Sequence, residues 1–162
     1  MKYLPIIALF IYLTACNLQT RETKKVHAKI DSLEEALAAT YKPGFGEFMS
    51  GIQVHHAKLW FAGLNQNWAL ADFELHEIQE AFEDIQQFCN DRSEARSISM
   101  IGPAMDSVTN SVNQKDLNRF KGSYILLTTA CNSCHKATKH GFNVVTVPLN
   151  LPVPNQDFKP IK

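Results

Sequence analysis

Residues 68–89, WALADFELHEIQEAFEDIQQFC, carry the strongest periodicity in the sequence. Their apolar residues recur with steps of three and four positions, at Trp68, Ala71, Leu75, Ile78, Phe82, Ile85 and Cys89. This spacing is typical of a helix that packs against neighbouring helices around a common core. The opposite face carries acidic residues, at Glu74, Glu77, Glu80, Glu83 and Asp84. We expect this acidic face to be solvated and Cys89, on the apolar stripe, to be a buried and unreactive thiol.

Similar patterns predict three further helices in the same unit, over about 44–63, 98–112 and 117–140. Pro103 lies inside the second of these segments, so that helix either begins near Gly102 or is kinked there. Asn113 or Asp116 is expected to cap the last helix. A short leading helix is expected over 30–41. The predicted fold is all-α, an antiparallel four-helix bundle within residues 29–140, followed by an extended tail, 141–162, that is rich in proline.

The first residues have the pattern of an export signal. Lys2 precedes an uncharged run that is shorter than the roughly 20 residues needed to span a bilayer as a helix. The run ends in Leu-Thr-Ala-Cys at 13–16, which resembles the lipobox of bacterial lipoproteins. The resemblance implies a signal peptide over 1–15, acylation of Cys16 and a lipidated tether over 16–28. An ordinary secretory signal with a chance cysteine is the alternative.

The predicted export signal and the composition indicate where the protein acts and what it binds. The resemblance implies that the chain lies on the periplasmic side of a bacterial membrane. In lipoproteins an Asp after the acylated cysteine favours retention at the inner membrane. This chain has Asn17 there, which favours the outer membrane. Lys and Arg number 16 and Asp and Glu number 16, so the net charge is zero. Without a basic excess, nucleic acid is excluded as the main partner.

The chemistry-bearing motif is Cys-Asn-Ser-Cys-His at 131–135. Cys-x-x-Cys-His is the attachment signature of c-type haem, in which two thiols form thioethers and the imidazole ligates the iron. On a helix Cys131, Cys134 and His135 share one face, so that all three can meet one porphyrin. The sequence therefore predicts one covalently bound haem c.

Three other interpretations of the cysteine pair fit less well. A thioredoxin-like redox pair needs a preceding strand, whereas this pair follows a helical pattern. A zinc site needs further ligands, and no second Cys-x-x-Cys occurs in the sequence. A disulfide between positions 131 and 134 is disfavoured by helix geometry.

A single Cys-x-x-Cys-His on the last helix of a four-helix bundle resembles the class II cytochromes c, which include the cytochromes c′ and their low-spin relatives. The resemblance covers residues 44–138 and depends on Cys131, Cys134 and His135. It implies that His135 is the proximal iron ligand. Members of this family often form dimers, so a homodimer is one possible oligomeric state. The tail after Thr138 departs from the family, whose chains usually end soon after the motif.

Topology predicts which residue fills the sixth coordination position. In an antiparallel bundle the start of the first helix opposes the end of the fourth. Met49 lies about 7 Å into the first helix and His56 about 18 Å into it. Low-spin members of the family carry a methionine ligand near the start of their first helix, so Met49 is the expected distal ligand. His56 is a weaker alternative, and a third possibility is that the sixth coordination position is empty. His55 is expected at a helix boundary, and Tyr124 either against the porphyrin or in the core.

The expected function is one-electron transfer between redox partner proteins, by a membrane-anchored cytochrome that is not an enzyme. The sequence offers no acid–base pair that would indicate a peroxidase. One alternative is a gas-binding protein that takes nitric oxide or carbon monoxide at an open distal site. The other is a structural lipoprotein without haem.

Overall fold

The computed structural model describes the backbone of residues 4–40 and 43–161, and side chains for 21–39 and 43–161. It is 74% helical, and its described residues contain no strand. The prediction of an all-α chain is confirmed. The chain divides into two units, Met1–Lys42 and Pro43–Lys162.

The described residues of the first unit form a single helix, α1, over Leu4–Thr40. The sequence predicts a tether over 16–28 and a separate helix over 30–41, whereas the structure has one continuous helix through both. The reason is composition, because residues 6–42 contain no glycine or proline and residues 18–40 are rich in helix formers. Pro43 begins the second unit, so residues 29–40 lie in the first unit, in α1, and apart from the later helices. Among the described residues, no helix has the length and apolar character to cross a membrane.

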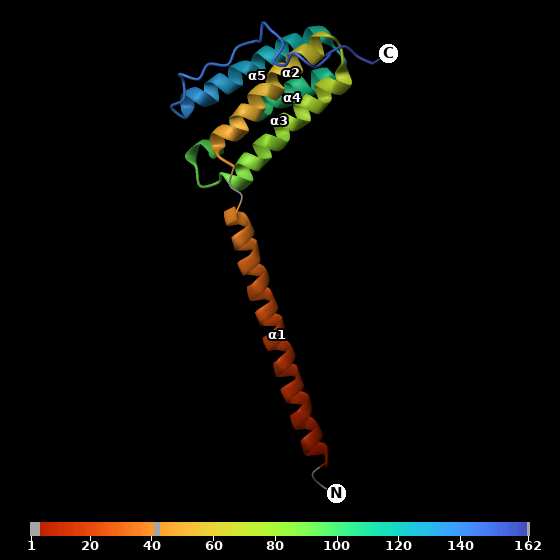
Figure 1. The fold of residues 1–162 in the computed structure, drawn as a ribbon, viewed down its shortest axis with the longest axis vertical. Helices are drawn as coiled ribbons and strands as arrows, with labels where there is room; N and C mark the ends of the chain where they lie inside the picture. Colours follow the sequence, from red (N-terminus) through yellow and green to blue (C-terminus); the bar gives the residue numbers. More distant parts are fainter. Residues whose placement is uncertain (1–3, 41–42, 162) are drawn as a thin grey trace. The chain divides into compact units, whose positions relative to one another are not determined.

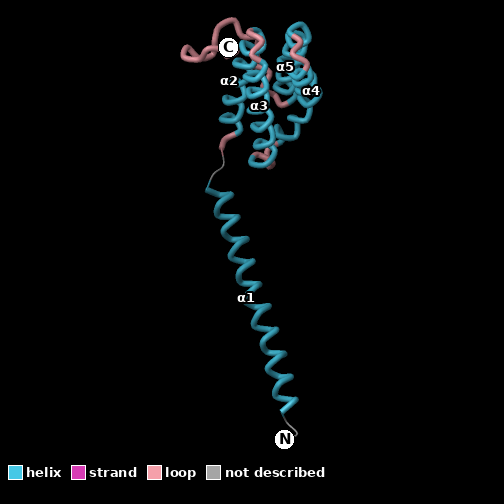
Figure 2. Tube along the Cα trace, turned by 90° about the vertical axis from the view of Figure 1, so that its right-hand side faces the viewer, coloured by secondary structure: helices cyan, strands magenta, loops and turns pink. Residues whose placement is uncertain are grey.

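The second unit is built from four α-helices and a 3₁₀ segment, α2 (Phe45–Leu64), α3 (Trp68–Phe88), η1 (Ser93–Ile101), α4 (Gly102–Asn113) and α5 (Leu117–Ala137). The main contacts join α2 to α3 and α4 to α5 (Figures 1 and 2). Further contacts join α3 to α4 and α2 to α5, and η1 touches α3, α4 and α5. The five elements therefore surround one core.

The predicted apolar stripe of α3 lies in this core, with Ala71, Leu75, Ile78, Phe82, Ile85 and Cys89 all buried. The α4 segment resolves the two alternatives at Pro103, because α4 begins at Gly102 and places the proline in its first turn. Residues 93–101 before it wind as a 3₁₀ helix and bury Ile98 and Ile101.

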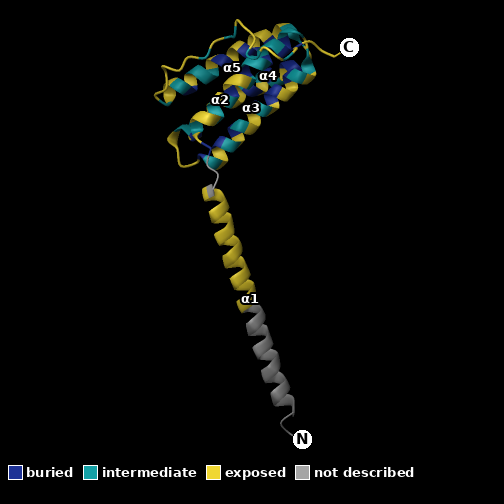
Figure 3. Cartoon of the chain, viewed as in Figure 1, coloured by how far each residue is buried: buried dark blue, intermediate teal, exposed yellow. Residues whose placement is uncertain are grey.

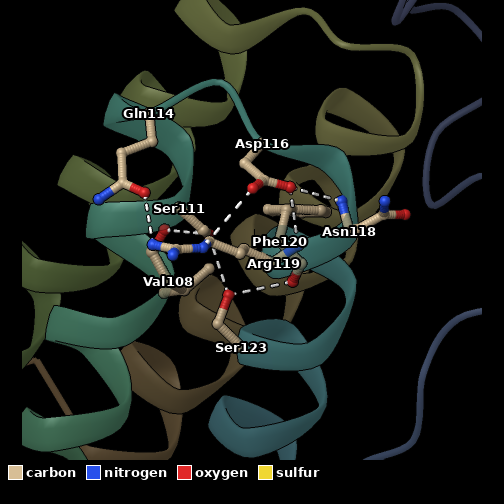
Figure 4. A network of polar contacts seen from close by, with 8 residues as sticks. All are labelled: Val108, Ser111, Gln114, Asp116, Asn118, Arg119, Phe120 and Ser123. Atoms are coloured by element: carbon tan, nitrogen blue, oxygen red, sulfur yellow. Dashed lines mark hydrogen bonds and ion pairs between the residues drawn. The ribbon is translucent and has the colours of Figure 1, made fainter.

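A polar network fixes the turn between α4 and α5 (Figure 4). Asp116 caps α5, since its carboxylate accepts hydrogen bonds of 3.0 Å from the backbone N–H groups of Asn118 and Arg119. Deeper in the interface, the hydroxyls of Ser111 and Ser123 lie 2.9 Å apart and are buried. This turn sets α4 and α5 antiparallel and so fixes the direction in which α5 runs.

The turn between α2 and α3 is close to the start of α5. Gly63 packs directly on the ring of Phe120, where an added Cβ would lie 2.2 Å from the ring carbons. The end of α2 therefore meets the first turn of α5. It follows that the start of α2 and the end of α5 lie together at the other end of the unit.

The tail returns along the helices from the end of α5. Thr138 ends α5, and the residues after it form no helix up to residue 161. Phe158 is buried with its ring 5.8 Å from that of Phe61, and the amide of Asn67 donates to the carbonyl of Lys159 over 3.1 Å. The tail thus spans the unit from the end of α5 to the α2–α3 turn, as an extended segment laid on the helices.

Candidate functional site

An apolar cavity lies where α2 begins and α5 ends. Its volume is about 40 Å³, below the range of about 300–1,000 Å³ for small-molecule and cofactor sites, so a cofactor could enter only if the lining moved apart. Residues from α2, α3, η1, α5 and the tail line it: Met49, Ile52, Gln53, His56, Phe82, Ile101, Cys131, Cys134, His135, Asn143 and Val145. All the predicted haem-site residues therefore border one cavity.

A second, more polar hollow adjoins the first and shares four of its residues, Met49, Cys134, His135 and Asn143. It adds Arg92 from the loop after α3, Glu94 from η1 and His140 from the residues after α5. His140 is exposed, as expected for a residue beyond the end of α5. The Met49 and His135 side chains thus stand at the boundary between an apolar interior and a charged opening.

The two cysteines of the motif are free thiols on the cavity face of α5. Burial raises the pKa of Cys131 to about 11, and repulsion from Cys134 adds to this effect. Burial also raises the pKa of the Cys134 thiol, whose Sγ lies 3.6 Å from the carbonyl oxygen of Ser97. At neutral pH both groups are therefore protonated thiols in the folded chain.

The imidazole of His135 is oriented by the tail. Its Nδ1 lies 2.7 Å from the backbone carbonyl oxygen of Asn143. A carbonyl can only accept, so Nδ1 carries the proton and the neutral ring keeps its lone pair on Nε2. Histidines that ligate metals almost always donate their other ring N–H to such an acceptor. His135 thus has the tautomer that iron ligation through Nε2 requires.

Asn132, between the two cysteines, holds the tail segment that supplies this carbonyl. Its side-chain amide donates to the carbonyl of Val145 and accepts from the Val145 N–H, both over 2.8 Å. This reciprocal pair fixes the segment 143–145 against α5. The Cys-x-x-Cys-His motif assigns no role to Asn132. Its contact with Val145 could not be predicted, because no sequence period relates a helix residue to an irregular segment thirteen residues later.

Met49 lies in the second turn of α2 and is partly buried. It borders both hollows together with His135. The antiparallel arrangement therefore brings these two residues to one cavity, as the topological argument expects. Ligation by the Met49 thioether remains a prediction.

His56 also borders the cavity, although the helix arithmetic placed it too far along α2. The Nε2 atom of His56 lies 3.0 Å from the hydroxyl of Thr128, which also donates to the carbonyl of Tyr124. The Nδ1 atom lies 2.9 Å from the hydroxyl of Tyr124, which also donates to the carbonyl of His56. Burial lowers the pKa of His56 to about 4. His56 is thus a neutral core histidine with both ring nitrogens hydrogen-bonded.

Tyr124 belongs to the core on the inner side of the cavity. Its ring stacks on His56 at 4.5 Å between centroids, and it also contacts Trp60 and Phe120. It is fully buried and does not line the cavity. Of the two roles expected for Tyr124, the structure therefore supports packing in the core.

The acidic face of α3 differs from expectation at Glu74, which is fully buried rather than solvated. Its Oε2 accepts from His55 Nδ1 over 2.6 Å, and its Oε1 lies 4.0 Å from the ammonium of Lys58. The expectation for Glu74 was wrong because α2 covers this part of α3 and supplies two basic side chains. His55 lies in the middle of α2 rather than at a helix boundary.

Two further observations complete the site. Within the described residues, no three or more His, Cys, Asp or Glu side chains form a group that could hold a metal ion. Cys16, the predicted lipidation site, lies outside the residues whose side chains the structure describes, as does the predicted signal peptide. Comparison of the chain with protein-family models, with curated proteins and with solved structures yields no match.

Proposed function

We propose that this chain is an exported monohaem c-type cytochrome of the four-helix-bundle type, which carries single electrons between membrane-associated redox partners. One observation carries the proposal: Cys131, Cys134, His135 and Met49 border a single apolar cavity. The two thiols and the imidazole come from one face of α5, and the thioether comes from the facing helix α2.

The residues fit a covalently bound haem on three counts. The cavity has the apolar lining of a cofactor site, and at about 40 Å³ it would have to widen to admit the group. Two free thiols border it, at the spacing that haem attachment uses. In its neutral form His135 has its lone pair on Nε2, because the Nδ1–H donates to the Asn143 carbonyl. No other pair of thiols in the described chain combines these features, since Cys89 is buried at the end of α3.

Each residue would have a separate task toward the cofactor. A bound haem supplies an iron that gains and loses one electron. Cys131 and Cys134 would hold the macrocycle by thioether bonds, and His135 would be the proximal ligand. Met49 would occupy the sixth position and favour the ferrous state. Ile52, Phe82 and Ile101 would exclude water, which lowers the local dielectric and also favours the less charged iron.

The state of the thiols limits when attachment takes place. In the folded chain both thiols have raised pKa values and Cys134 is 5% exposed. The thiolate is the reactive form of cysteine, so these groups are poor nucleophiles once the helices have closed. We therefore expect the haem to be attached before α5 packs against α2, with folding then completing the cavity.

The predicted export signal and the lipobox-like Cys16 support a location of the proposed cytochrome at the periplasmic side of a membrane. Cys16 lies within α1, and a helix from residue 16 to residue 40 rises about 36 Å at 1.5 Å per residue. Acylation of Cys16 would therefore leave the second unit a long helical spacer for reaching partners.

The test is expression with the haem-attachment machinery, followed by haem staining after denaturing electrophoresis. The wild type and Cys89→Ser should stain, whereas the double variant Cys131→Ser, Cys134→Ser should not. Visible spectra of both oxidation states, with and without carbon monoxide, then test the sixth site. A low-spin spectrum that carbon monoxide barely changes supports electron transfer. An unstained wild type would refute the haem proposal, and rapid carbon monoxide binding would replace electron transfer with gas binding.

A further inference from the structure

The described part of α1 carries an apolar stripe that faces solvent. Val26, Ile30, Leu33 and Leu37 are 54%, 46%, 56% and 74% exposed. Figure 3 colours residues 21–39 of α1 as exposed throughout. Burying such a stripe is favourable by about 25 cal/mol for each Å² of apolar surface removed from water.

The stripe has heptad spacing, with steps of four, three and four residues. This spacing places Ile30 and Leu37 at a positions and Val26 and Leu33 at d positions. A β-branched residue at a followed by leucine at d favours two parallel strands, and Ile30 with Leu33 is such a pair. From this pattern we propose that α1 pairs with α1 of a second copy of this chain in a parallel two-stranded coiled coil.

The charges beside the stripe are complementary in that arrangement. The same register puts Lys29 at a g position and Glu34 at the next e position. In a parallel coiled coil these positions form salt bridges between the two helices. Lys29 of each copy therefore faces Glu34 of the partner subunit, and the pair occurs twice by symmetry.

Two apolar heptads are short for a coiled coil, so the pairing depends on local concentration. An isolated helical segment of only two heptads is marginal in water. Two chains held in one membrane by Cys16 meet at a far higher effective concentration than free chains do. Parallel pairing also fits two chains anchored at the same end. This step uses the proposed lipid anchor, but nothing in it depends on haem.

The test is disulfide cross-linking between full-length chains in native membranes. Leu33→Cys places a thiol at d, in the predicted interface, and Glu35→Cys places one at f, on the outer face. Mild oxidation should give an intermolecular dimer for Leu33→Cys and far less for Glu35→Cys. Equal yields at the two positions would overturn the proposal. If neither variant gives a dimer, the proposal is also overturned. The apolar stripe would then be covered by another part of the same chain or by the bilayer.

Charge exchange tests the register in the Leu33→Cys background. Lys29→Glu alone or Glu34→Lys alone sets like charges opposite each other and should lower the cross-linking yield. The double exchange restores opposite charges and should restore the yield. If the two single variants cross-link as well as their parent, the parallel register is refuted. Haem staining of the same samples shows that a failure here is separate from a failure of the cytochrome proposal.

Discussion

The Nδ1 atom of His135 lies 2.7 Å from the carbonyl oxygen of Asn143, a residue of the tail. The imidazole that would bind iron is thus oriented by a segment that follows its own helix in the chain. Asn132 fixes that segment through two hydrogen bonds of 2.8 Å with the backbone of Val145. The tail is therefore part of the site, and its removal should affect the chemistry of His135.

Asn132→Ala should loosen this arrangement. It leaves the partly buried N–H and carbonyl of Val145 without their partners, which should cost about 1–3 kcal/mol in the free energy of unfolding, measured with urea. In the haem-loaded protein the midpoint potential should rise, because a weaker hydrogen bond at Nδ1 makes His135 a less basic ligand. Ser133→Ala, at the exposed neighbouring position, is the control. Equal behaviour of the two variants would show that Asn132 does not position His135.

Alkylation should report the state of the thiols in chains without haem. With the pKa of Cys131 raised to about 11, its thiolate is about 100-fold scarcer than in a free cysteine with a pKa near 9. Iodoacetamide at pH 8 should therefore label Cys131 and Cys134 slowly in the folded chain and rapidly in urea. The measurement is mass spectrometry of peptides over time. Rapid labelling of the folded chain would contradict the proposal that attachment precedes folding.

The buried His56 predicts how stability changes with pH. Its pKa is lowered to about 4 by burial, so between pH 6.5 and pH 4 the unfolded chain binds a proton that the folded chain does not. Stability is therefore complete above pH 6.5 and falls as the pH drops, by about 3 kcal/mol in total, levelling off below pH 4. His56→Gln should flatten this part of the profile, measured by urea unfolding at each pH. His76→Gln, at an exposed position of α3, should leave it unchanged.

The pair formed by Glu74 and His55 should matter for stability. Glu74 is fully buried and its Oε2 accepts a 2.6 Å hydrogen bond from His55 Nδ1. His55→Ala leaves the buried carboxylate without this donor and should reduce the free energy of unfolding by about 1.5–3 kcal/mol at neutral pH. Glu80→Ala, on the exposed part of the same helix, is the control. A loss no larger than that of the control would mean that Lys58 or water satisfies Glu74 equally well.

Periodicity predicted the parts of this fold that repeat along a helix. The apolar stripe of α3 was recognisable because every third or fourth residue is buried against one core. The same reasoning failed at Glu74, since helical spacing shows which residues share a face but not where a neighbouring helix covers that face. It also separated a tether from a leading helix, whereas the helix formers between residues 18 and 40 sustain one helix.

The site was predictable to the extent that it depends on motif and topology. Cys131, Cys134 and His135 follow from their spacing, and the place of Met49 follows from the antiparallel order of the helices. The contacts of Asn132 with Val145 join a helix to an irregular tail, and no sequence period encodes them. The sequence did not predict that His56 borders the cavity. Its distance from the start of α2 can be calculated from the helical rise per residue, but that distance does not show how far the cavity extends into the core.

Met49→Ala tests whether electron transfer or gas binding is the function of the proposed haem. Met49 and His135 border the same two hollows, so the thioether and the imidazole would both be available to a haem bound there. Its removal should convert a low-spin iron to a high-spin one, lower the midpoint potential and speed carbon monoxide binding, because no internal ligand then has to leave.

Met100→Ala, at an exposed position on η1, is the control for loss of a methionine. His56→Gln should leave the spin state unchanged, since the His56 nitrogens are held by Tyr124 and Thr128. If the wild type is already high-spin and binds carbon monoxide as fast as Met49→Ala, then Met49 is a core residue and the distal site is open.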